Sequence, residues 1–493
     1  NGELFSANAG AVCSAADSSY QVIGSCPALT PSDLGDPGFK KTYGVTYPLY
    51  GGSMANGISS EDFVIALGKA GFMGSFGAGG CLPKRIESAI DRIKTELKGK
   101  PFLFNLLNSP FEPALEAQTT ALYLKHGIQA IEASAYLALT PNLVWYRLKG
   151  LSQLPDGSIQ CANRIIAKVS RKEVALRFLQ PAESNIVNQL LAEGKITEEQ
   201  ARLAQFVPMA DDITVEADSG GHTDNRPLVS ILPAIIHLRN TIQEKYHFAQ
   251  QTRIGAAGGI ATPSSALAAF MMGAAYVATG SVNQGCSEAG TSEHSKHLLA
   301  QMDITDVAMA PASDMFEMGV RVQVLKRGTM FAMRGQRLFE IYQKYQSIDE
   351  IPASEKEKLE TTLFKQSLES VWDECIKFFT ERDPKQIDRA RQNPKDKMAL
   401  VFRWYLGLSS RWAMVGEKGR EMDYQIWCGP AMGAFNDWVK GTYLESPESR
   451  SAADISLHIL TGAAYLWRVR LLELTGLQFS NAISQYTPSE RRL

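Results

Sequence analysis

Short apolar runs alternate with helical segments eight times between residue 45 and residue 330 of this 493-residue chain. Such alternation is typical of βα units around a parallel sheet, and eight of these units close into a barrel. The predicted strands are Val45–Ala55, Met73–Gly79, Phe102–Leu107, Ala130–Ser134, Ile165–Val169, Thr214–Ala217, Arg253–Ala257 and Tyr276–Thr279. The sequence therefore predicts an α/β fold, a (β/α)₈ TIM barrel.

Helix start signals follow several of these strands. Ser60, Thr140 and Thr262 each stand where an N-cap is expected, and the last two precede a proline. The predicted helices are Ser60–Ala70, Pro83–Lys98, Pro113–His126, Asn142–Lys149, Lys172–Phe178, Leu228–Tyr246 and Pro263–Met272. We expect the eighth helix after Ser287.

Two helical additions to the barrel are predicted. The long interval between the fifth and sixth strands contains a helix start capped by Thr197, which indicates a helical insertion near residues 183–206. Strand-like runs stop after Met330, and charged helical sequence follows. The chain thus divides into an N-terminal segment (1–44), the barrel (45–330) and a C-terminal helical appendage (331–493), which we interpret as a substrate or lid region.

Composition excludes several function classes. The net charge of −2, without an extended basic field, argues against nucleic acid as a partner. The longest apolar stretch, Ala266–Thr279, is shorter than the roughly 20 residues of a membrane span. Seven cysteines form no CxxC pair, which favours a reduced, cytoplasmic compartment. His294 and His297 share a helix face without a third ligand, so no metal is expected.

The loops after the seventh and eighth strands carry the first candidate site. In TIM barrels a phosphate commonly sits between these two loops. The first loop contains Gly258 and Gly259, and the second contains Thr279, Gly280 and Ser281. Glycine lets the backbone approach an anion closely. Either loop alone is weak evidence, but both at the correct places of an eight-unit count predict one phosphate cradle.

A second candidate site follows the sixth strand, where Ser219, Gly220 and Gly221 precede His222. The glycines permit close backbone approach, and His222 brings a titratable imidazole to the barrel mouth. The alternative is a loop histidine bonded to Asp218 or Asp224.

Asn105, Asn108 and Lys168 belong to strands that end at the same mouth. A lysine inside an apolar strand costs free energy unless it meets an anion or another acceptor. Lys168 therefore either faces a bound group or forms a salt bridge with Glu132 or Glu216 inside the barrel.

Several motifs resemble the PfaD family, the FMN-dependent enoyl reductases that act in trans in polyunsaturated fatty acid and polyketide synthases, within the wider nitronate monooxygenase-like group. The motifs are Gly51–Gly57, Ala217–Pro227, Gly255–Ile260, Ala278–Gln284, Met318–Val320, Phe402–Leu408 and Trp427–Trp438. The similarity runs from about residue 45 to the C-terminus, and its later motifs lie outside a generic barrel.

The resemblance implies FMN as cofactor and NADPH as reductant. It implies that Gly258, Gly259, Gly280 and Ser281 hold the FMN phosphate, with Thr279 beside them. The other implied cofactor contacts are Met54 and Ala55 beside the ring, Asn105 and Lys168 on its polar edge, and Ser219, Gly220 and Gly221.

The implied reaction reduces the 2,3 double bond of an enoyl thioester carried on an acyl carrier protein domain. His222 is the candidate catalytic acid, and the N–H groups of Gly220 and Gly221 are candidates to hold the thioester carbonyl. A homodimer is expected for this barrel type. Two alternatives stay open: a nitronate monooxygenase that uses His222 as base, and a flavin-free scaffold barrel that binds a phosphorylated metabolite.

Overall fold

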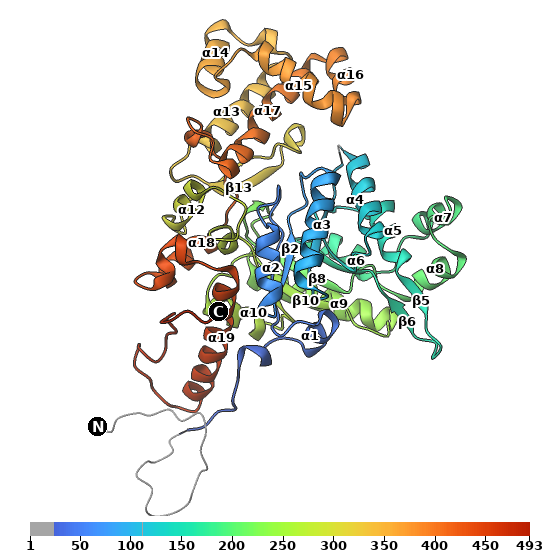
Figure 1. Cartoon of the computed structure of the whole chain (residues 1–493), viewed down its shortest axis with the longest axis vertical. Helices are drawn as coiled ribbons and strands as arrows, with labels where there is room; N and C mark the ends of the chain where they lie inside the picture. The colour runs from blue at the N-terminus through green and yellow to red at the C-terminus, as the bar shows by residue number, and fades with distance from the viewer. Residues whose placement is uncertain (1–23, 111) are drawn as a thin grey trace, which may run out of the picture.

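A closed barrel of eight parallel strands forms the centre of the molecule (Figure 1). The computed structural model describes residues 24–110 and 112–493. The strands are β1 (Leu49–Gly51), β2 (Met73–Phe76), β3 (Leu103–Leu107), β4 (Ala130–Ser134), β7 (Arg164–Val169), β8 (Asp212–Glu216), β10 (Arg253–Ala257) and β11 (Val277–Thr279). Each strand pairs with its sequence neighbour in the barrel, and β11 pairs with β1 to close it. The predicted TIM barrel is confirmed.

The N-terminal end of the barrel is plugged by helix α1 (Pro37–Tyr43), which lies in the segment expected to precede the barrel. Its Phe39 stacks on Tyr276, and its Tyr43 hydroxyl donates to Asp212 at 2.6 Å. Arg253 forms a buried ion pair with the same Asp212 carboxylate. Because this end is sealed by packed rings and buried charge, the opposite end, where the strands terminate, is left for a site.

Seven of the outer helices follow the predicted pattern. Their bounds are α2 (Glu61–Lys69), α3 (Pro83–Leu97), α4 (Pro113–Lys125), α5 (Pro141–Lys149), α6 (Lys172–Leu179), α9 (Leu228–Tyr246) and α10 (Pro263–Met271). The hydroxyls of Ser60, Thr140 and Thr262 accept backbone N–H groups at the starts of α2, α5 and α10. The three predicted N-caps are confirmed.

The eighth outer helix differs from the expectation. The short helices α11 (Ser281–Gln284) and α12 (Glu293–Ala300) follow β11, but α19 (Ala452–Leu474) packs between α10 and α2. The helix that completes the barrel therefore comes from the C-terminal end of the chain, and everything between α11 and α19 is an insertion into the eighth βα unit.

The helical insertion after β7 is present as α7 (Ser184–Ala192), α8 (Glu198–Leu203) and the 3₁₀ turn Ala204–Phe206. It lies at the side of the barrel with an unpredicted hairpin of β5 (Leu151–Gln153) and β6 (Ile159–Cys161), as Figure 1 shows at the right. Thr197 caps α8 as predicted.

A second sheet was not predicted. It consists of β12 (Val307–Pro311), β13 (Arg321–Leu325) and β9 (Gly221–His222), all antiparallel. The two residues of β9 gain their ladder hydrogen bonds only from β13, about 100 residues away in sequence. No local sequence pattern predicts such a strand, because its ladder hydrogen bonds come entirely from β13.

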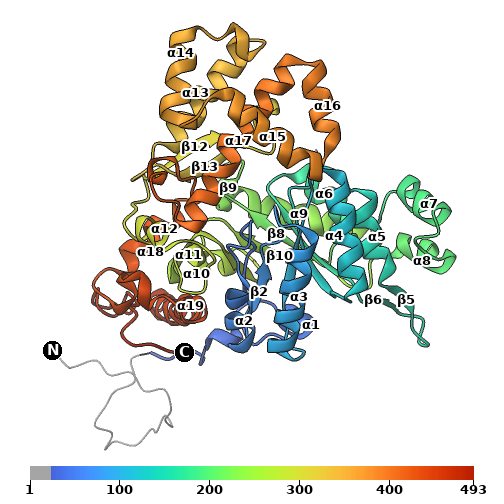
Figure 2. The same ribbon diagram turned by 45° about the horizontal axis from the view of Figure 1, so that its top comes forward.

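The helical appendage lies beyond this sheet, at the top of Figure 1. Its elements are α13 (Phe331–Lys344), α14 (Ala353–Lys358), a π-helical turn (Leu359–Phe364), α15 (Leu368–Arg382), α16 (Pro384–Gln392) and α17 (Pro394–Val415). Helix α18 (Ala431–Val439) follows and lies lower in Figure 1, against α11 and α12. Arg382 at the end of α15 pairs with Glu112 in the β3–α4 loop, so the appendage contacts the rim of the barrel, where Figure 2 places α16 above α4.

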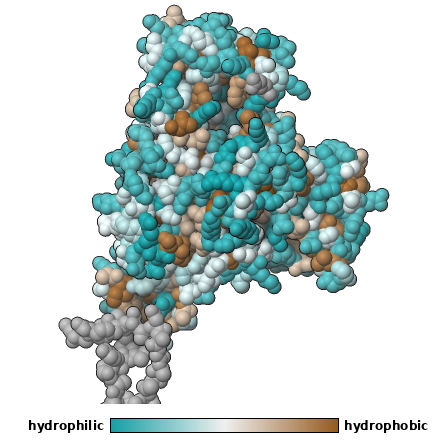
Figure 3. Space-filling view, viewed as in Figure 1, coloured by the Kyte–Doolittle hydropathy of each residue, from teal (hydrophilic) through white to brown (hydrophobic). Residues whose placement is uncertain are grey.

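Exposed hydrophobic side chains occur singly or in small groups across a largely hydrophilic face (Figure 3). Within the described residues, none of the helices has the length and apolar character needed to cross a membrane.

Candidate functional site

Three charged side chains meet inside the mouth of the barrel. Lys168 Nζ lies 3.0 Å from Glu216 Oε1 and 3.7 Å from Glu132 Oε1. Glu132 is fully buried, and its second oxygen accepts the Ser53 N–H at 2.9 Å. Burial opposes the charge on Lys168, but Glu216 and then Glu132 outweigh it and raise the lysine pKa. The salt bridge that the sequence left open as an alternative for Lys168 is therefore present, with both carboxylates.

Two of the predicted cofactor contacts, Ala55 and Asn105, lie near Gly79. A Cβ placed on Gly79 would lie 3.5 Å from Asn105 Oδ1 in strand β3 and 3.6 Å from the Ala55 Cβ in the loop after β1. The Asn105 amide nitrogen donates to the Glu132 carbonyl and to Ser134 Oγ, both at 3.0 Å. The side-chain oxygen of Asn105 lies on the side of Gly79.

Met54 is held by its backbone. Its N–H donates to Ser59 Oγ at 2.9 Å, and its carbonyl packs so closely on Gly77 that a Cβ there would lie 1.7 Å away. The loop after β1 is thus fixed against the loop after β2. Asn108, the remaining polar candidate of β3, donates instead to the Ala135 carbonyl at 3.4 Å.

The predicted phosphate loops are adjacent and open. Gly258 has φ of +79°, and a Cβ there would lie 2.7 Å from the Ala217 backbone, so this position favours glycine for both reasons. A Cβ on Gly259 or Gly280 would meet no atom within 4 Å. The Thr279 hydroxyl accepts the Asn283 amide at 2.9 Å. Gly259 and Gly280 therefore border space that a ligand can fill.

The loop after β8 adds an unsatisfied polar atom. Ser219 Oγ is buried and has no hydrogen-bond partner among the described residues. A buried hydroxyl without a partner is costly, which is typical of a site that a bound group completes. Together with the open glycines, this oxygen fits a phosphorylated cofactor.

The two glycines that follow Ser219 have different surroundings. A Cβ on Gly220 would lie 2.7 Å from the Cys428 Cα, whereas one on Gly221 would meet nothing within 4 Å. Gly220 thus packs against the chain returning from the appendage, and Gly221 begins β9.

His222 lies on the small sheet rather than in a loop, paired with Val322. Its Nε2 lies 3.2 Å from Asp314 Oδ1, and both side chains are partly exposed. Desolvation opposes protonation of His222, but the hydrogen bond and charge of Asp314, with the charge of Glu216, outweigh it and raise the histidine pKa. These interactions favour the protonated form of the ring.

The two partners suggested by the sequence for His222 were wrong. Asp218 accepts Asn225 and Gln323 at 2.8 Å each. Asp224 is held by Arg171 and Ser170, which lower its pKa to about 2. The true partner, Asp314, is 92 residues from His222 in sequence and reaches it only through the unpredicted sheet.

Gln323 is a further residue that the sequence analysis missed. It is buried, and its amide donates to Asp218 and to the Ser219 carbonyl, both at 2.8 Å. It therefore fixes the loop that carries Ser219. Among the described residues, no group of three or more His, Cys, Asp or Glu is placed to bind a metal ion.

Comparison with protein families gives two matches. The nitronate monooxygenase family matches residues 38–333, which is more than half of the chain. The inserted helical domain of [acyl-carrier-protein] S-malonyltransferase matches residues 345–424, within the appendage.

Two curated relatives cover most of the chain. One component of the polyunsaturated fatty acid synthase of Thraustochytrium sp. (strain ATCC 26185 / S-3) is 50% identical over 450 residues, which are 90% of this chain and 30% of that protein. Polyketide biosynthesis protein PksE of Bacillus subtilis (strain 168) is 46% identical over 444 residues, 90% of this chain and 58% of that protein. The chain spans less than two thirds of either relative.

A solved structure matches over its full length. The enoyl reductase domain of MlnA from the macrolactin biosynthesis cluster of Bacillus amyloliquefaciens is 41% identical, with a TM-score of 0.85 over 90% of this chain and 100% of that domain. The chain therefore belongs to the PfaD-like enoyl reductases of the nitronate monooxygenase family.

Proposed function

We propose that the protein is an FMN-dependent, NADPH-using enoyl reductase that reduces the 2,3 double bond of enoyl thioesters on acyl carrier protein during polyunsaturated fatty acid or polyketide biosynthesis. The observation that carries this proposal is the phosphate cradle, in which Gly259 and Gly280 border open space, together with the unpartnered hydroxyl of Ser219 on the loop after β8. The family and the MlnA enoyl reductase domain support the reaction class.

The residues of the mouth would hold the cofactor as follows. Gly258, Gly259, Gly280 and Ser281 bind the phosphate with Thr279 behind them, and Ser219 completes the polar wall. Met54 and Ala55 would contact the ring, and Asn105 and Lys168 would supply polar groups to its edge. When bound, FMN would accept hydride from NADPH and deliver it to the β-carbon of the enoyl thioester.

His222 is the proposed proton donor to the α-carbon. Asp314 holds the ring and, with Glu216, raises the pKa of His222, which favours the protonated form that a general acid requires. Gly221, which precedes it, borders open space where a thioester carbonyl would lie, whereas Gly220 is occupied by its contact with Cys428.

Carrier protein as partner is proposed from two observations. One relative is a subunit of a polyunsaturated fatty acid synthase and another is a polyketide biosynthesis protein, and the appendage matches the inserted helical domain of [acyl-carrier-protein] S-malonyltransferase. We assign the appendage to substrate binding on this basis, and keep a homodimer and a cytoplasmic location as part of the same proposal.

Anaerobic flavin spectroscopy tests the proposal. The purified protein should carry flavin absorbance that NADPH bleaches, and crotonyl thioester on a carrier protein should restore it. No bound flavin would favour the scaffold alternative. Flavin that a nitronate reduces and oxygen reoxidises, but that no enoyl thioester reoxidises, would favour the nitronate monooxygenase alternative, which is the family that matches residues 38–333.

A variant of His222 tests the role of the acid independently of cofactor binding. His222→Asn should still allow NADPH to bleach the flavin but should slow reoxidation by the enoyl thioester about 10²-fold or more. In the unmodified protein, the reoxidation rate should fall as pH rises through the raised pKa of His222, because the proton is then lost. An equal rate in the variant would contradict the role of His222 as acid.

A further inference from the structure

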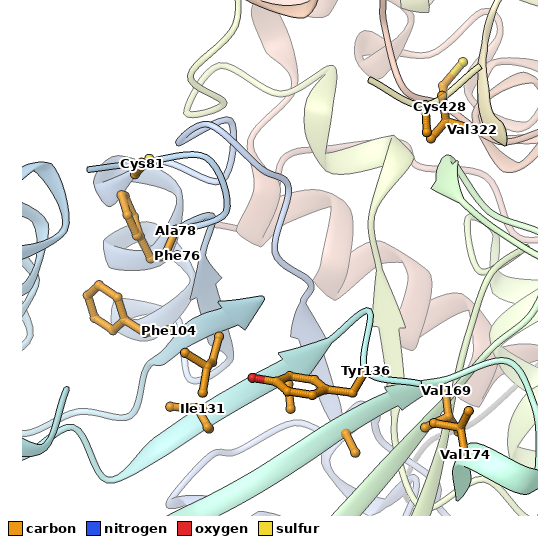
Figure 4. Close-up of a cluster of buried hydrophobic side chains, with 14 of the residues drawn as sticks. Phe76, Ala78, Cys81, Phe104, Ile131, Tyr136, Val169, Val174, Val322 and Cys428 are labelled. Carbon is orange, nitrogen blue, oxygen red and sulfur yellow. The ribbon is translucent and has the colours of Figure 1, made fainter. Parts of the chain in front are cut away.

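The chain returns from the helical appendage across the barrel mouth through Trp427–Pro430, which we call the strap. The Leu325 N–H donates to the Ile426 carbonyl at 2.8 Å, and Trp427 forms an antiparallel bridge with Val324. The strap thus continues the small sheet that carries His222. Figure 4 shows Cys428 against Val322 of β13, and Cys428 is fully buried.

Two glycines let the strap touch the loop after β8. A Cβ on Gly220 would lie 2.7 Å from the Cys428 Cα, and a Cβ on Gly429 would lie 3.0 Å from Gly220 N. A Cβ at 2.7 Å from backbone would force a shift, and one at 3.0 Å would press on its neighbour, so both positions favour glycine if the contact is kept. The loop that carries Ser219 is therefore clamped by the strap.

The strap also touches the loop after β11. The Gly429 N–H donates to Ser281 Oγ at 3.0 Å. A hydroxyl has one proton and two lone pairs. Because Gly429 occupies a lone pair, the Ser281 proton is left to donate, and within residues 24–110 and 112–493 no acceptor receives it.

We propose that the strap is a wall of the phosphate site, and that Gly429 is a positioning residue which orients the Ser281 hydroxyl to donate to a phosphate oxygen. The strap meets Ser281 on one side and the Ser219 loop on the other, while Gly258 packs on Ala217 of that same loop. The three loops around the cradle are thus held in one arrangement by a segment outside the barrel's own βα units. The inference rests on the proposed function, since it takes the ligand to be a flavin phosphate.

The test measures binding to flavin-free protein instead of activity. FMN and riboflavin are titrated separately, with quenching of flavin fluorescence as the readout, so the ratio of the two dissociation constants reports the phosphate contacts alone. The variants are Ser281→Ala, Gly429→Ala and the two combined. Gly407→Ala is the control, because a Cβ at this helical position meets nothing closer than Ser313 Oγ at 4.0 Å. Thermal unfolding checks that each variant folds.

Each single variant should lose about tenfold or more of the preference for FMN, as expected when a hydrogen bond to a charged acceptor is removed, with riboflavin affinity unchanged. The combined variant should lose no more than Ser281→Ala alone, because Gly429 acts through Ser281. The control should match the unmodified protein.

A folded Gly429→Ala variant that keeps the full preference for FMN would overturn the proposal, as would equal losses of FMN and riboflavin affinity. Should Gly429→Ala not fold, Ser281→Ala decides, because it removes only a hydroxyl; an unchanged preference then overturns the proposal. Failure of the unmodified protein to prefer FMN over riboflavin would instead contradict the proposed function.

Discussion

At the scale of single residues, the mouth of the barrel depends on compensated charge. Glu132 is fully buried and Lys168 nearly so, yet each finds partners: Lys168 lies between two carboxylates, and Glu132 also accepts the Ser53 N–H. A buried ion pair adds little net stability, but removing one partner leaves an uncompensated charge. The charged side chains of Glu132, Lys168 and Glu216 therefore line the barrel mouth, and loss of the Lys168 cation should lower the stability of the fold.

Replacing the cation tests this interpretation of the triad. Lys168→Met should lower the free energy of unfolding of the flavin-free protein by about 3–5 kcal/mol, because Glu132 would remain buried without its cation. Chemical denaturation monitored by circular dichroism measures the change.

Lys69→Met is the matched control, because Lys69 pairs with Glu96 at the exposed surface and should leave the transition midpoint unchanged. A loss below about 1 kcal/mol in Lys168→Met would mean that Glu132 is neutral or reached by water after the substitution.

At the scale of elements, the C-terminal helix α19 belongs to the barrel. It packs against α10 and α2, in the place of the helix that follows the eighth strand. Gly462 allows the close approach, since a Cβ there would lie 2.4 Å from Pro263 Cγ and 2.5 Å from Tyr486 Cδ1. The appendage therefore lies in the chain between strand β11 and helix α19, and because both belong to the barrel, both ends of the appendage are fixed.

A pair of glycine substitutions tests the packing of α19. Gly462→Ala should destabilise the protein by about 1–3 kcal/mol, because the added methyl group forces α19 away from α10. Gly407→Ala, also in a helix interior but with nothing closer than 4.0 Å, should stabilise it by up to about 1 kcal/mol through helix propensity. Thermal unfolding measures both, and stabilisation by both substitutions would contradict the close contact.

At the scale of the whole molecule, the appendage is attached to the barrel rim as well as through its two ends. Arg382 donates to both carboxylate oxygens of Glu112, with one contact at 2.9 Å, and both side chains are about one-fifth exposed. A bidentate pair of this kind fixes direction as well as distance. It holds α15 and α16 beside the β3–α4 loop, close to the mouth.

A double-mutant cycle tests this attachment. Glu112→Gln and Arg382→Met should each speed amide hydrogen exchange in α15 and α16, and the combined variant should add little, with a coupling of about 0.5–3 kcal/mol in local stability. Arg470→Met, which removes a pair within α19 alone, should leave exchange in α15 and α16 unchanged. Additive effects would show that the two side chains act independently.

Local signals in the sequence were enough to predict the barrel strands and seven of the helices that surround them. Apolar periodicity, N-caps and paired glycine loops each involve residues close together in the chain. They also placed the candidate loops at one end, since parallel strands of a barrel end on the same face. Gly259 and Gly280 border open space as a cradle requires.

The remaining features depend on contacts between distant segments. Asp314 contacts His222, Gly429 contacts Ser281, and α19 packs as the eighth outer helix of the barrel. In each case the two partners are more than 90 residues apart in the chain. These contacts arise from strand pairing and helix packing, whose free energy appears only when both partners are in place. No local pattern of residues records such a contact, so the sequence could indicate a site at the barrel mouth but could not show the strap that crosses it.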